Sequence, residues 1–367
     1  MASHPLLDLK QYGQAVWLDN LSRPLIRSGE LQRLVQEDGI SGVTSNPAIF
    51  NKAMTGGTAY DEAMTALVQE GKATLEIYEA LAIADIRDAC DLLRPVHDAT
   101  DGSDGFVSLE VSPHLAHDTQ GTIQEAARLW QTVGRRNLLV KIPGTAAGIP
   151  AVEACLTRGI NVNVTLLFSL GAYNQVIDAH IRALQARADM GEDVRQVASV
   201  ASFFLSRIDV KLDPRLATSA PDLMGKVAVA NAKLAYALWE KKMETSAWRA
   251  LAAAGARVQK PLWASTSTKN PDYPDVMYVE PLIGPHTVNT MPDETIAAFK
   301  DHGRAGVSVT QGIEESRATM ARLEGLGIDM GRVTGDLLAE GITKFIKPFD
   351  DLLAALEAKR ESLAAAG

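Results

Sequence analysis

Hydrophobic residues in this chain recur as short runs, and longer segments with helical periodicity separate these runs. A mostly apolar run of about four to eight residues, bounded by glycine, proline or polar residues, is typical of a buried strand. The predicted strands are Ala15–Asp19, Gly42–Asn46, Phe106–Val111, Leu138–Pro143, Asn161–Leu166, Val197–Phe204, Pro261–Thr266 and Val276–Leu282. The predicted helices cover Glu30–Asp38, 58–97, 121–134, 146–158, 169–189 and 222–256.

Strands that alternate with helices predict a parallel sheet, and eight of them suffice to close a (β/α)8 TIM barrel. Residues 303–367 form a predicted helical C-terminal extension, with periodic segments at Ile313–Leu326 and Leu337–Leu356. No low-complexity linker interrupts the chain, so we expect residues 1–367 to form a single barrel domain. A doubly wound open sheet is the competing architecture. The absence of GxGxxG after the first predicted strand disfavours its dinucleotide-binding version.

Composition narrows the class of protein. The 367 residues are 46% hydrophobic and 22% charged, which is ordinary for a globular protein. The net charge of −9 disfavours a general nucleic-acid binder, although it permits a local basic pocket for a small phosphorylated ligand. Cys90 and Cys155 have no CxxC spacing, which fits a reducing compartment. No signal peptide or membrane-spanning run is evident, so we expect a cytoplasmic protein.

A lysine stands within the fourth predicted strand, whose sequence is LLVKIP. Burial disfavours the charged ammonium form of lysine, and a neutral lysine amine attacks carbonyl carbon to form a Schiff base. The alternative is a structural lysine at a strand end, whose aliphatic carbons pack against apolar neighbours while its ammonium group reaches water. Which interpretation holds for Lys141 depends on the residues around it.

Polar residues end several of the other predicted strands, and in a (β/α)8 barrel the C-terminal strand ends build the active site. Each has an ordinary alternative: Asp19 could cap a helix, Asn46 could serve a turn, and Arg207 could pair with Asp209. Together, a lysine, two carboxylates, hydroxyls, amides and flanking cations indicate an imine-forming aldol enzyme that acts on a sugar phosphate. The set comprises Asp19, Thr44, Ser45, Asn46, Glu110, Lys141, Asn161, Asn163, Thr165, Ser202, Arg207 and Ser265–Lys269.

On the fifth predicted strand, Asn161, Asn163 and Thr165 alternate with aliphatic residues. Because the face toward the helices must be apolar, we expect all three polar side chains to point into the barrel.

The histidines do not form a sequence motif that is typical of a metal site. None of the seven forms an HxH or HExxH pair, and His114 and His117 lack a third ligand. We therefore expect neither a metal nor a cofactor, and a metal-dependent aldol cleavage is disfavoured.

Two long motifs resemble those of the transaldolase family. The first is GVTSNPAIF at Gly42–Phe50, and the second is LLVKIPGTAAGIPA, which continues into GINVNVTLLFS at Gly159–Ser169. The tail and the segment ASTSTKNPDYPDVMYVEPLIGPHTVNTMP resemble the longer bacterial branch of the family. The resemblance implies a metal-free, class I enzyme of the non-oxidative pentose phosphate pathway. Such an enzyme transfers a dihydroxyacetone unit from sedoheptulose 7-phosphate to glyceraldehyde 3-phosphate, giving erythrose 4-phosphate and fructose 6-phosphate.

The resemblance also implies roles for individual residues. Lys141 matches the Schiff-base lysine, Asp19 matches the acid/base on the C4 hydroxyl, and Glu110 with Thr165 matches the pair that holds the catalytic water. A second arginine that binds phosphate in better-known members is unmatched, and we expect Lys269, with Ser265, to take its place. The implied substrate-binding residues are Thr44, Ser45, Asn46, Asn163, Ser202, Phe204, Arg207, Ser265 and Lys269.

Two other functions stay open at this point. A fructose 6-phosphate aldolase-like enzyme would use the same lysine but release free dihydroxyacetone. A catalytically silent sugar-phosphate-binding barrel would need neither Lys141 nor Asp19. The expected partners are small sugar phosphates, with no nucleic acid and no membrane, for a monomer or homodimer that could also form part of a larger enzyme.

Overall fold

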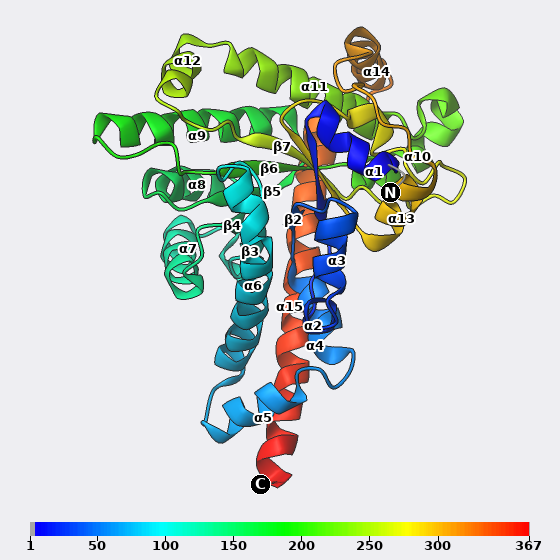
Figure 1. Ribbon diagram of the computed structural model, residues 1–367. Helices are drawn as coiled ribbons and strands as arrows, with labels where there is room; N and C mark the ends of the chain where they lie inside the picture. Colours follow the sequence, from blue (N-terminus) through cyan, green and yellow to red (C-terminus); the bar gives the residue numbers. More distant parts are fainter. Residues whose placement is uncertain (1–3, 367) are drawn as a thin grey trace.

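Eight parallel strands form a closed barrel in the computed structural model, which describes residues 4–366 of the chain (Figure 1). Each strand pairs with the next in chain order, and β8 pairs with β1 to close the sheet. The predicted (β/α)8 TIM barrel is therefore confirmed. The strands are β1 (Gln14–Leu18), β2 (Gly42–Val43), β3 (Val107–Glu110), β4 (Leu138–Pro143), β5 (Val162–Leu167), β6 (Ser199–Phe204), β7 (Lys260–Ala264) and β8 (Thr287–Met291).

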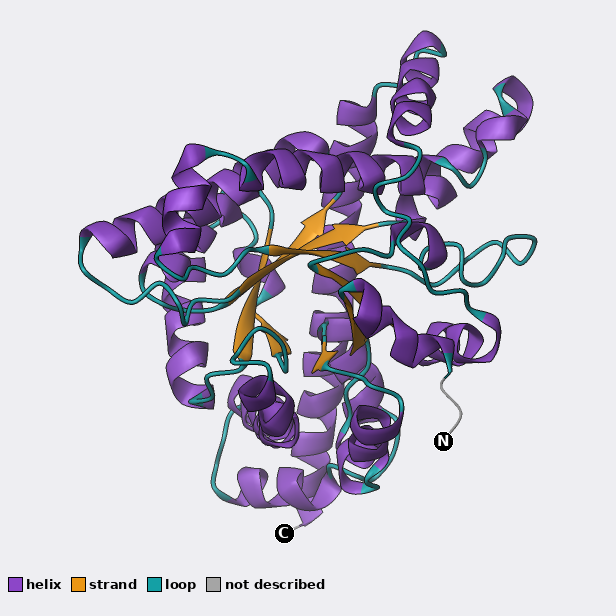
Figure 2. Cartoon of the chain, turned by 45° about the horizontal axis from the view of Figure 1, so that its top comes forward, coloured by secondary structure: helices purple, strands orange, loops and turns teal. Residues whose placement is uncertain are grey.

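Helices surround the strands (Figure 2). The predicted helix over 58–97 is divided into α5 and α6, because the chain turns at Gly71, whose φ of +75° lies in the left-handed region. The helices are α1 (Pro5–Asp8), α2 (Arg23–Arg27), α3 (Glu30–Glu37), α4 (Pro47–Thr55), α5 (Asp61–Gln69), α6 (Thr74–Ala99), α7 (Thr119–Val133), α8 (Gly148–Thr157), α9 (Leu170–Asp189), α10 (Ser206–Ser219), α11 (Val227–Met243), α12 (Ser246–Ala253), α13 (Asp293–His302), α14 (Ile313–Gly325) and α15 (Met330–Ala366). Four short 3-10 helices are η1 (Leu9–Tyr12), η2 (Pro113–Leu115), η3 (Pro221–Leu223) and η4 (Glu280–Leu282).

The central strands are buried on both faces. Every residue of β4, β5 and β6 is buried, which explains why these segments read as nearly continuous apolar runs. In the register of the sheet, Glu110 pairs with Lys141, and Lys141 pairs with Asn163. Paired residues on neighbouring parallel strands project from the same face of the sheet. The fold therefore sets these three polar side chains side by side.

The eighth strand lies outside the predicted segment Val276–Leu282. That segment forms turns and ends in η4, and its apolar residues, such as Val276 and Tyr278, are buried without joining the sheet. The actual strand, β8, has the sequence TVNTM, and its polar side chains are buried in the fold. Gln14 donates to the Thr287 hydroxyl at 3.0 Å, and Asn289 donates to the backbone oxygen of Tyr278 at 3.2 Å. The apolar-run criterion failed here because hydrogen bonds, not apolar contacts, satisfy the buried strand.

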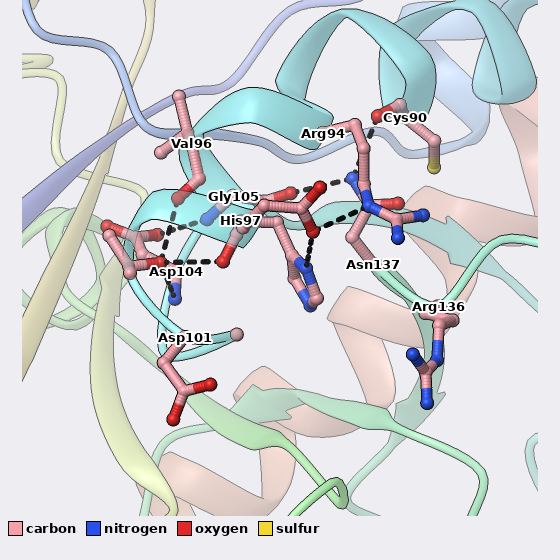
Figure 3. A network of polar contacts seen from close by, with 12 residues as sticks. Cys90, Arg94, Val96, His97, Asp101, Asp104, Gly105, Arg136 and Asn137 are labelled. Carbon is pink, nitrogen blue, oxygen red and sulfur yellow. Dashed lines mark hydrogen bonds and ion pairs between the residues drawn. The ribbon is translucent and has the colours of Figure 1, made fainter.

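The loop between α6 and β3 is fixed by a network of polar contacts at the N-terminal end of the barrel (Figure 3). Asn137 donates from Nδ2 to the backbone oxygens of Cys90 and Gly105, both at 2.9 Å. Gly105 has a φ of +85°, and a Cβ there would lie 2.3 Å from the backbone nitrogen of His97, so only glycine fits. The network thus ties α6 and β3 to the residue that precedes β4.

The predicted C-terminal helical tail is confirmed as α14 and α15. In Figure 1, α15 runs as the long orange-to-red helix past the strands to the C-terminus beside α5. It packs against α4, α5, α6, α10 and β5. Its buried face includes Leu337, Phe345, Phe349, Leu352 and Leu356. The tail is therefore an integral part of the packed structure.

One buried ion pair joins α2 to α6 and yields a stability prediction. Arg23, which is 4% exposed, donates from Nε to Asp85 Oδ1 at 2.8 Å, and Tyr60 donates to Asp85 Oδ2 at 2.7 Å. Asp85→Ala leaves the guanidinium buried without its partner, so we expect the free energy of unfolding to fall by about 3–5 kcal/mol. Urea denaturation followed by circular dichroism measures this change.

The matched control is Asp91→Ala, which removes the partner of Arg135 on the surface side of the same helix. Because this pair is exposed, we expect a loss below about 1 kcal/mol. Equal losses in both variants would contradict the importance of the buried pair.

Candidate active site

A cavity of about 600 Å³ opens where the barrel strands end. Its wall combines residues that follow or end β1, β2 and β4–β8 with residues of α15. Most of the residues predicted for the site line it: Asp19, Thr44, Asn46, Lys141, Thr165, Ser202, Phe204, Arg207, Ser265 and Lys269. Ser45, Glu110 and Asn163 do not line this cavity but contact the residues that do.

Lys141 of β4 is only 5% exposed. Its Nζ donates to the backbone oxygen of Ser45 at 3.1 Å and lies 3.8 Å from Glu110 Oε2, beyond direct hydrogen-bond distance. The ring of Phe345, from α15, has its centroid 5.5 Å from the same Nζ. The amine therefore has a single hydrogen bond within residues 4–366, and its remaining positions are left for a ligand.

Asp19 follows β1 and faces the same cavity. Thr44 donates to Asp19 Oδ1 at 2.8 Å, and the hydroxyls of Thr44 and Thr290 are 2.6 Å apart. Burial raises the pKa of Asp19, while the charge of Lys141 and the Thr44 hydrogen bond partly oppose the increase. The alternative that Asp19 caps a helix is wrong, because Ser22 caps α2. The carboxyl group is thus available to exchange a proton with a ligand.

Glu110 ends β3 and approaches Lys141 from the adjacent strand. Its side chain is 6% exposed, and Oε2 has no hydrogen-bond partner within the described part of the chain. Burial raises the pKa of Glu110 to about 7, although the charge of Lys141 acts in the opposite direction. The residue lines a second, largely apolar cavity of about 340 Å³, next to Tyr78 and beneath Phe349.

Side-chain hydrogen bonds link polar residues of β3, β5 and β6. Asn163 donates to the Ser108 hydroxyl at 3.0 Å and accepts from Ser202 at 2.7 Å. The Thr165 hydroxyl is buried in the cavity wall and has no partner among residues 4–366. This free hydroxyl is suited to bind a water molecule or a substrate hydroxyl.

Asn161, which we expected to point into the barrel with Asn163 and Thr165, instead hydrogen-bonds backbone groups away from the active-site cavity. Asn161 precedes β5 and caps the opposite end of the barrel. It donates to the backbone oxygen of Arg136 at 2.9 Å and accepts from the backbone nitrogen of Ala198 at 2.8 Å. Its side chain therefore satisfies backbone groups next to β4 and β6 that have no partner within the sheet.

Residues Ser45 and Asn46 connect β2 to α4. The Asn46 side chain accepts from the backbone nitrogen of Ile49 at 3.0 Å, as a helix cap, and also lines the cavity. The turn interpretation and the site interpretation therefore both describe Asn46. The Ser45 hydroxyl donates away from the cavity, to the backbone oxygen of Ser108 at 2.6 Å.

Cations gather at one part of the cavity. Arg207, at the start of α10, lies over the ring of Phe204 at 5.0 Å, and its Nη1 is buried without a partner in residues 4–366. Burial lowers the pKa of Arg207, and Asp19 and Glu340 oppose this shift. Pairing of Arg207 with Asp209 on a helix surface is wrong, because Asp209 is buried and accepts from Ala228 N and Tyr278 Oη.

Lys269 also lines the cavity and donates to the Ser267 hydroxyl. Ser265, which directly follows β7 and has a φ of +56°, has its hydroxyl oxygen 2.8 Å from that of Ser206. This pair of hydroxyls adds neutral hydrogen-bonding groups beside Arg207.

Several cavity residues escaped the sequence analysis. Thr290 was missed because β8 was placed too early in the chain. The four residues of α15 recur with spacings of three, four and one, which is the signature of one helix face, but nothing in the sequence says what that face covers. They are Leu337, Glu340, Lys344 and Phe345.

Within residues 4–366, no three carboxylate, imidazole or thiol side chains converge as metal ligands, and His114 instead contacts Asp350 at 2.7 Å. None of the helices described here combines the length and the apolarity that crossing a bilayer requires.

Comparison with known proteins gives consistent matches along the chain. Residues 16–356 match the family "Transaldolase/Fructose-6-phosphate aldolase". The chain is 52% identical to Transaldolase 2 of Nostoc sp. over 374 aligned residues, which cover 98% of each chain. It is 50% identical to a transaldolase of Parafrankia sp. over 369 residues and 99% of each chain. A transaldolase of Thermobifida fusca is 48% identical over 354 residues, covering 95% of this chain and 96% of the relative.

The raised pKa of Glu110 predicts a carboxyl group that titrates near neutral pH. In ¹³C NMR of glutamate-labelled protein, we expect one carboxyl resonance with a midpoint near pH 7 that is missing in Glu110→Gln. Because the folded pKa lies above the usual 4.5, the associated stabilisation is complete below about pH 4.5 and is lost as the pH rises through about 7. A midpoint below pH 5 would contradict this assignment.

Proposed function

This chain belongs to the transaldolase/fructose-6-phosphate aldolase family and is a transaldolase, and we propose that Lys141 carries the transferred three-carbon unit as a Schiff base. The observation that carries the proposal is a buried lysine amine with a single hydrogen bond, facing a cavity that also holds Asp19. The donors are sedoheptulose 7-phosphate and fructose 6-phosphate. The acceptors are glyceraldehyde 3-phosphate and erythrose 4-phosphate.

In the first step, the neutral amine of Lys141 attacks the C2 carbonyl carbon of the donor. The new N–C2 bond gives a carbinolamine, and its C2 oxygen leaves as water to form the protonated imine. Glu110 and Thr165 hold a water molecule that passes a proton from the Glu110 carboxyl to the C2 hydroxyl, which then leaves as water. Their unpartnered oxygens come from the two strands that flank β4, where Glu110 pairs with Lys141 and Thr165 pairs with Pro143, and this placement supports the assignment.

In the second step, Asp19 takes the proton of the C4 hydroxyl and the C3–C4 bond breaks. The bonding electron pair moves into the imine, so C3 becomes part of a neutral enamine while C4 leaves as an aldehyde. A raised pKa suits Asp19 to take this proton and to return it when the acceptor aldehyde is attacked. The Thr44–Thr290 pair orients its carboxyl group.

The remaining residues bind the substrate. Asn46, Ser202 and Thr44 bind the hydroxyls of the dihydroxyacetone unit. Ser45 and Asn163 lie outside the cavity wall, where Ser45 positions Lys141 and Asn163 positions Ser202 through hydrogen bonds. Phe204 supports Arg207, which binds the phosphate with Lys269 and Ser265.

The cover over Lys141 favours transfer over release of free dihydroxyacetone. Transfer requires that the enamine persist until an acceptor arrives, so water must not protonate C3. The ring of Phe345 lies over the Lys141 amine on the cavity side, where solvent would otherwise reach it. This observation favours the transferase over the aldolase-like alternative.

We also place the enzyme in the cytoplasm, as a monomer or homodimer. Cys90 and Cys155 are free thiols buried in α6 and α8, which fits a reducing compartment.

Borohydride trapping with fructose 6-phosphate tests the Schiff base. We expect a reduced three-carbon adduct on Lys141, located by intact mass and peptide mapping. Lys141→Ala and Lys141→Met should form no adduct and lose transfer activity while retaining their circular dichroism spectra. Lys269→Ala, which removes another cavity lysine, should still form the adduct. Substantial transfer by a folded Lys141 variant would refute the mechanism and revive the silent-barrel alternative.

Phe345→Ala tests the role of the cover. We expect acceptor-independent release of dihydroxyacetone from fructose 6-phosphate to rise several-fold relative to transfer, because water gains access to the enamine. Phe349→Ala is the control, since Phe349 is equally buried on the same helix but contacts Tyr78 and His114 instead. An unchanged ratio in Phe345→Ala, or the same increase in both variants, would contradict this role.

A further inference from the structure

One face of α15 forms a wall of the active-site cavity. Leu337, Glu340, Lys344 and Phe345 all line it, and their spacing places them on adjacent turns of one helix face. Phe345 covers Lys141, and Glu340 forms an ion pair with Lys211 on α10. Neither contact accounts for Lys344, which lies between Glu340 and Phe345 in the sequence.

A glycine lets this helix approach the phosphate-binding end of the cavity closely. Gly341 is buried in the interior of α15, where a Cβ would lie 2.9 Å from Leu166 Cδ2 and 3.4 Å from Arg207 Nη1. Glycine inside a helix costs about 0.5–1 kcal/mol relative to alanine. At Gly341 this loss of helix stability is accompanied by a close approach of α15 to Leu166 and Arg207. The backbone of α15 therefore lies almost directly against the Arg207 guanidinium.

Two cations at this end of the cavity have no protein partner. Arg207 Nη1 is buried and unpaired. Lys344 lines the cavity with an exposed side chain and makes no hydrogen bond or ion pair in the described part of the chain. The neighbouring cations are engaged, Lys211 by Glu340 and Lys269 by Ser267. An unpaired guanidinium nitrogen and an unpaired ammonium facing one cavity indicate that an anionic ligand binds between them.

The carboxylates of the cavity do not fill this position. Asp19 accepts from Thr44, and Glu340 is neutralised by Lys211. Glu294, at the start of α13, also lines the cavity, and no hydrogen bond or ion pair joins it to Arg207 within the described residues. The free positive charge therefore concentrates where Arg207 meets α15.

We propose that Lys344 binds the substrate phosphate together with Arg207, so that α15 determines the preference for phosphorylated sugars. Lys344 lies three residues after Gly341, one turn along the same face, where side-chain Cβ atoms are roughly 5–6 Å apart. Its flexible stem brings the ammonium to a phosphate that Arg207 already holds. The inference rests on the proposed function, because it assigns the sugar phosphates as the anionic ligands.

The experiment compares two acceptors with saturating fructose 6-phosphate as donor, namely erythrose 4-phosphate and unphosphorylated glyceraldehyde. In Lys344→Gln, which keeps the stem but removes the charge, we expect kcat/KM for erythrose 4-phosphate to fall roughly tenfold, the equivalent of about 1.4 kcal/mol. The value for glyceraldehyde should change less than about twofold, because no phosphate contact is lost. Lys344→Arg should restore kcat/KM to within about threefold.

The matched control is Lys347→Gln. Lys347 lies one turn further along α15, is exposed and pairs with Asp351 outside the cavity. We expect it to leave both acceptors unaffected. An equal loss for both acceptors in Lys344→Gln, no loss in either, or the same pattern in Lys347→Gln would overturn the proposal.

Inorganic phosphate separates this inference from the Schiff-base mechanism. Titration calorimetry with phosphate alone requires no chemistry at Lys141, and we expect Lys344→Gln to weaken phosphate binding about tenfold relative to the wild type. If borohydride trapping failed while this weakening was observed, the Schiff-base mechanism would fall and the phosphate site would stand. Unchanged phosphate binding would overturn the site even if the adduct formed.

Discussion

The structure depends on one constraint, the burial of a lysine amine inside the fourth strand of a closed parallel barrel. An amine in this position cannot keep its shell of water, and the polar groups that residues 4–366 offer it are the Ser45 carbonyl at 3.1 Å and a carboxylate at 3.8 Å. The same desolvation raises the pKa of that carboxylate, Glu110, to about 7. Incomplete satisfaction of both groups is costly for stability, and it leaves the Lys141 nitrogen and the Glu110 oxygen open to contact a ligand.

Dryness at Lys141 depends on a helix outside the barrel repeat. At the strand ends α15 forms one wall of the cavity, and the ring of its Phe345 lies over the Lys141 amine. This helix is held mainly at a distance from the chemistry, through contacts with α4, α5 and α6 and through the ring contacts of Phe349 with Tyr78 and His114. The packing of the tail therefore influences the solvent exposure of the Lys141 amine, although Lys141 and Phe345 lie about two hundred residues apart in the sequence.

Patterns within short stretches of sequence predicted the features that depend on neighbouring residues alone. Lys141 was found because a lysine within LLVKIP contradicts its apolar neighbours, and the barrel followed from the alternation of strands and helices. The failures share one cause. Strand β8 and Asn161 satisfy their buried polar groups through partners far along the chain, such as Gln14 and Ala198, which no local pattern reveals. The α15 face was visible as a helical stripe, but its partner is a cavity that exists only once the barrel has closed.

The arrangement of cations is compatible with the two half-reactions that the proposed covalent carrier, Lys141, requires. Among the residues described, Arg207 and Lys344 are the cavity cations without protein partners, and both lie at the same end of the cavity. If these two cations bind phosphate as proposed, a departing aldehyde phosphate and an incoming acceptor phosphate use one position in turn. The enamine has to survive the interval between them, when the phosphate position is empty and water can enter from that side. A cover fixed over Lys141 by Phe345, beside an open and positively charged end, meets both requirements: the amine stays dry while phosphates exchange.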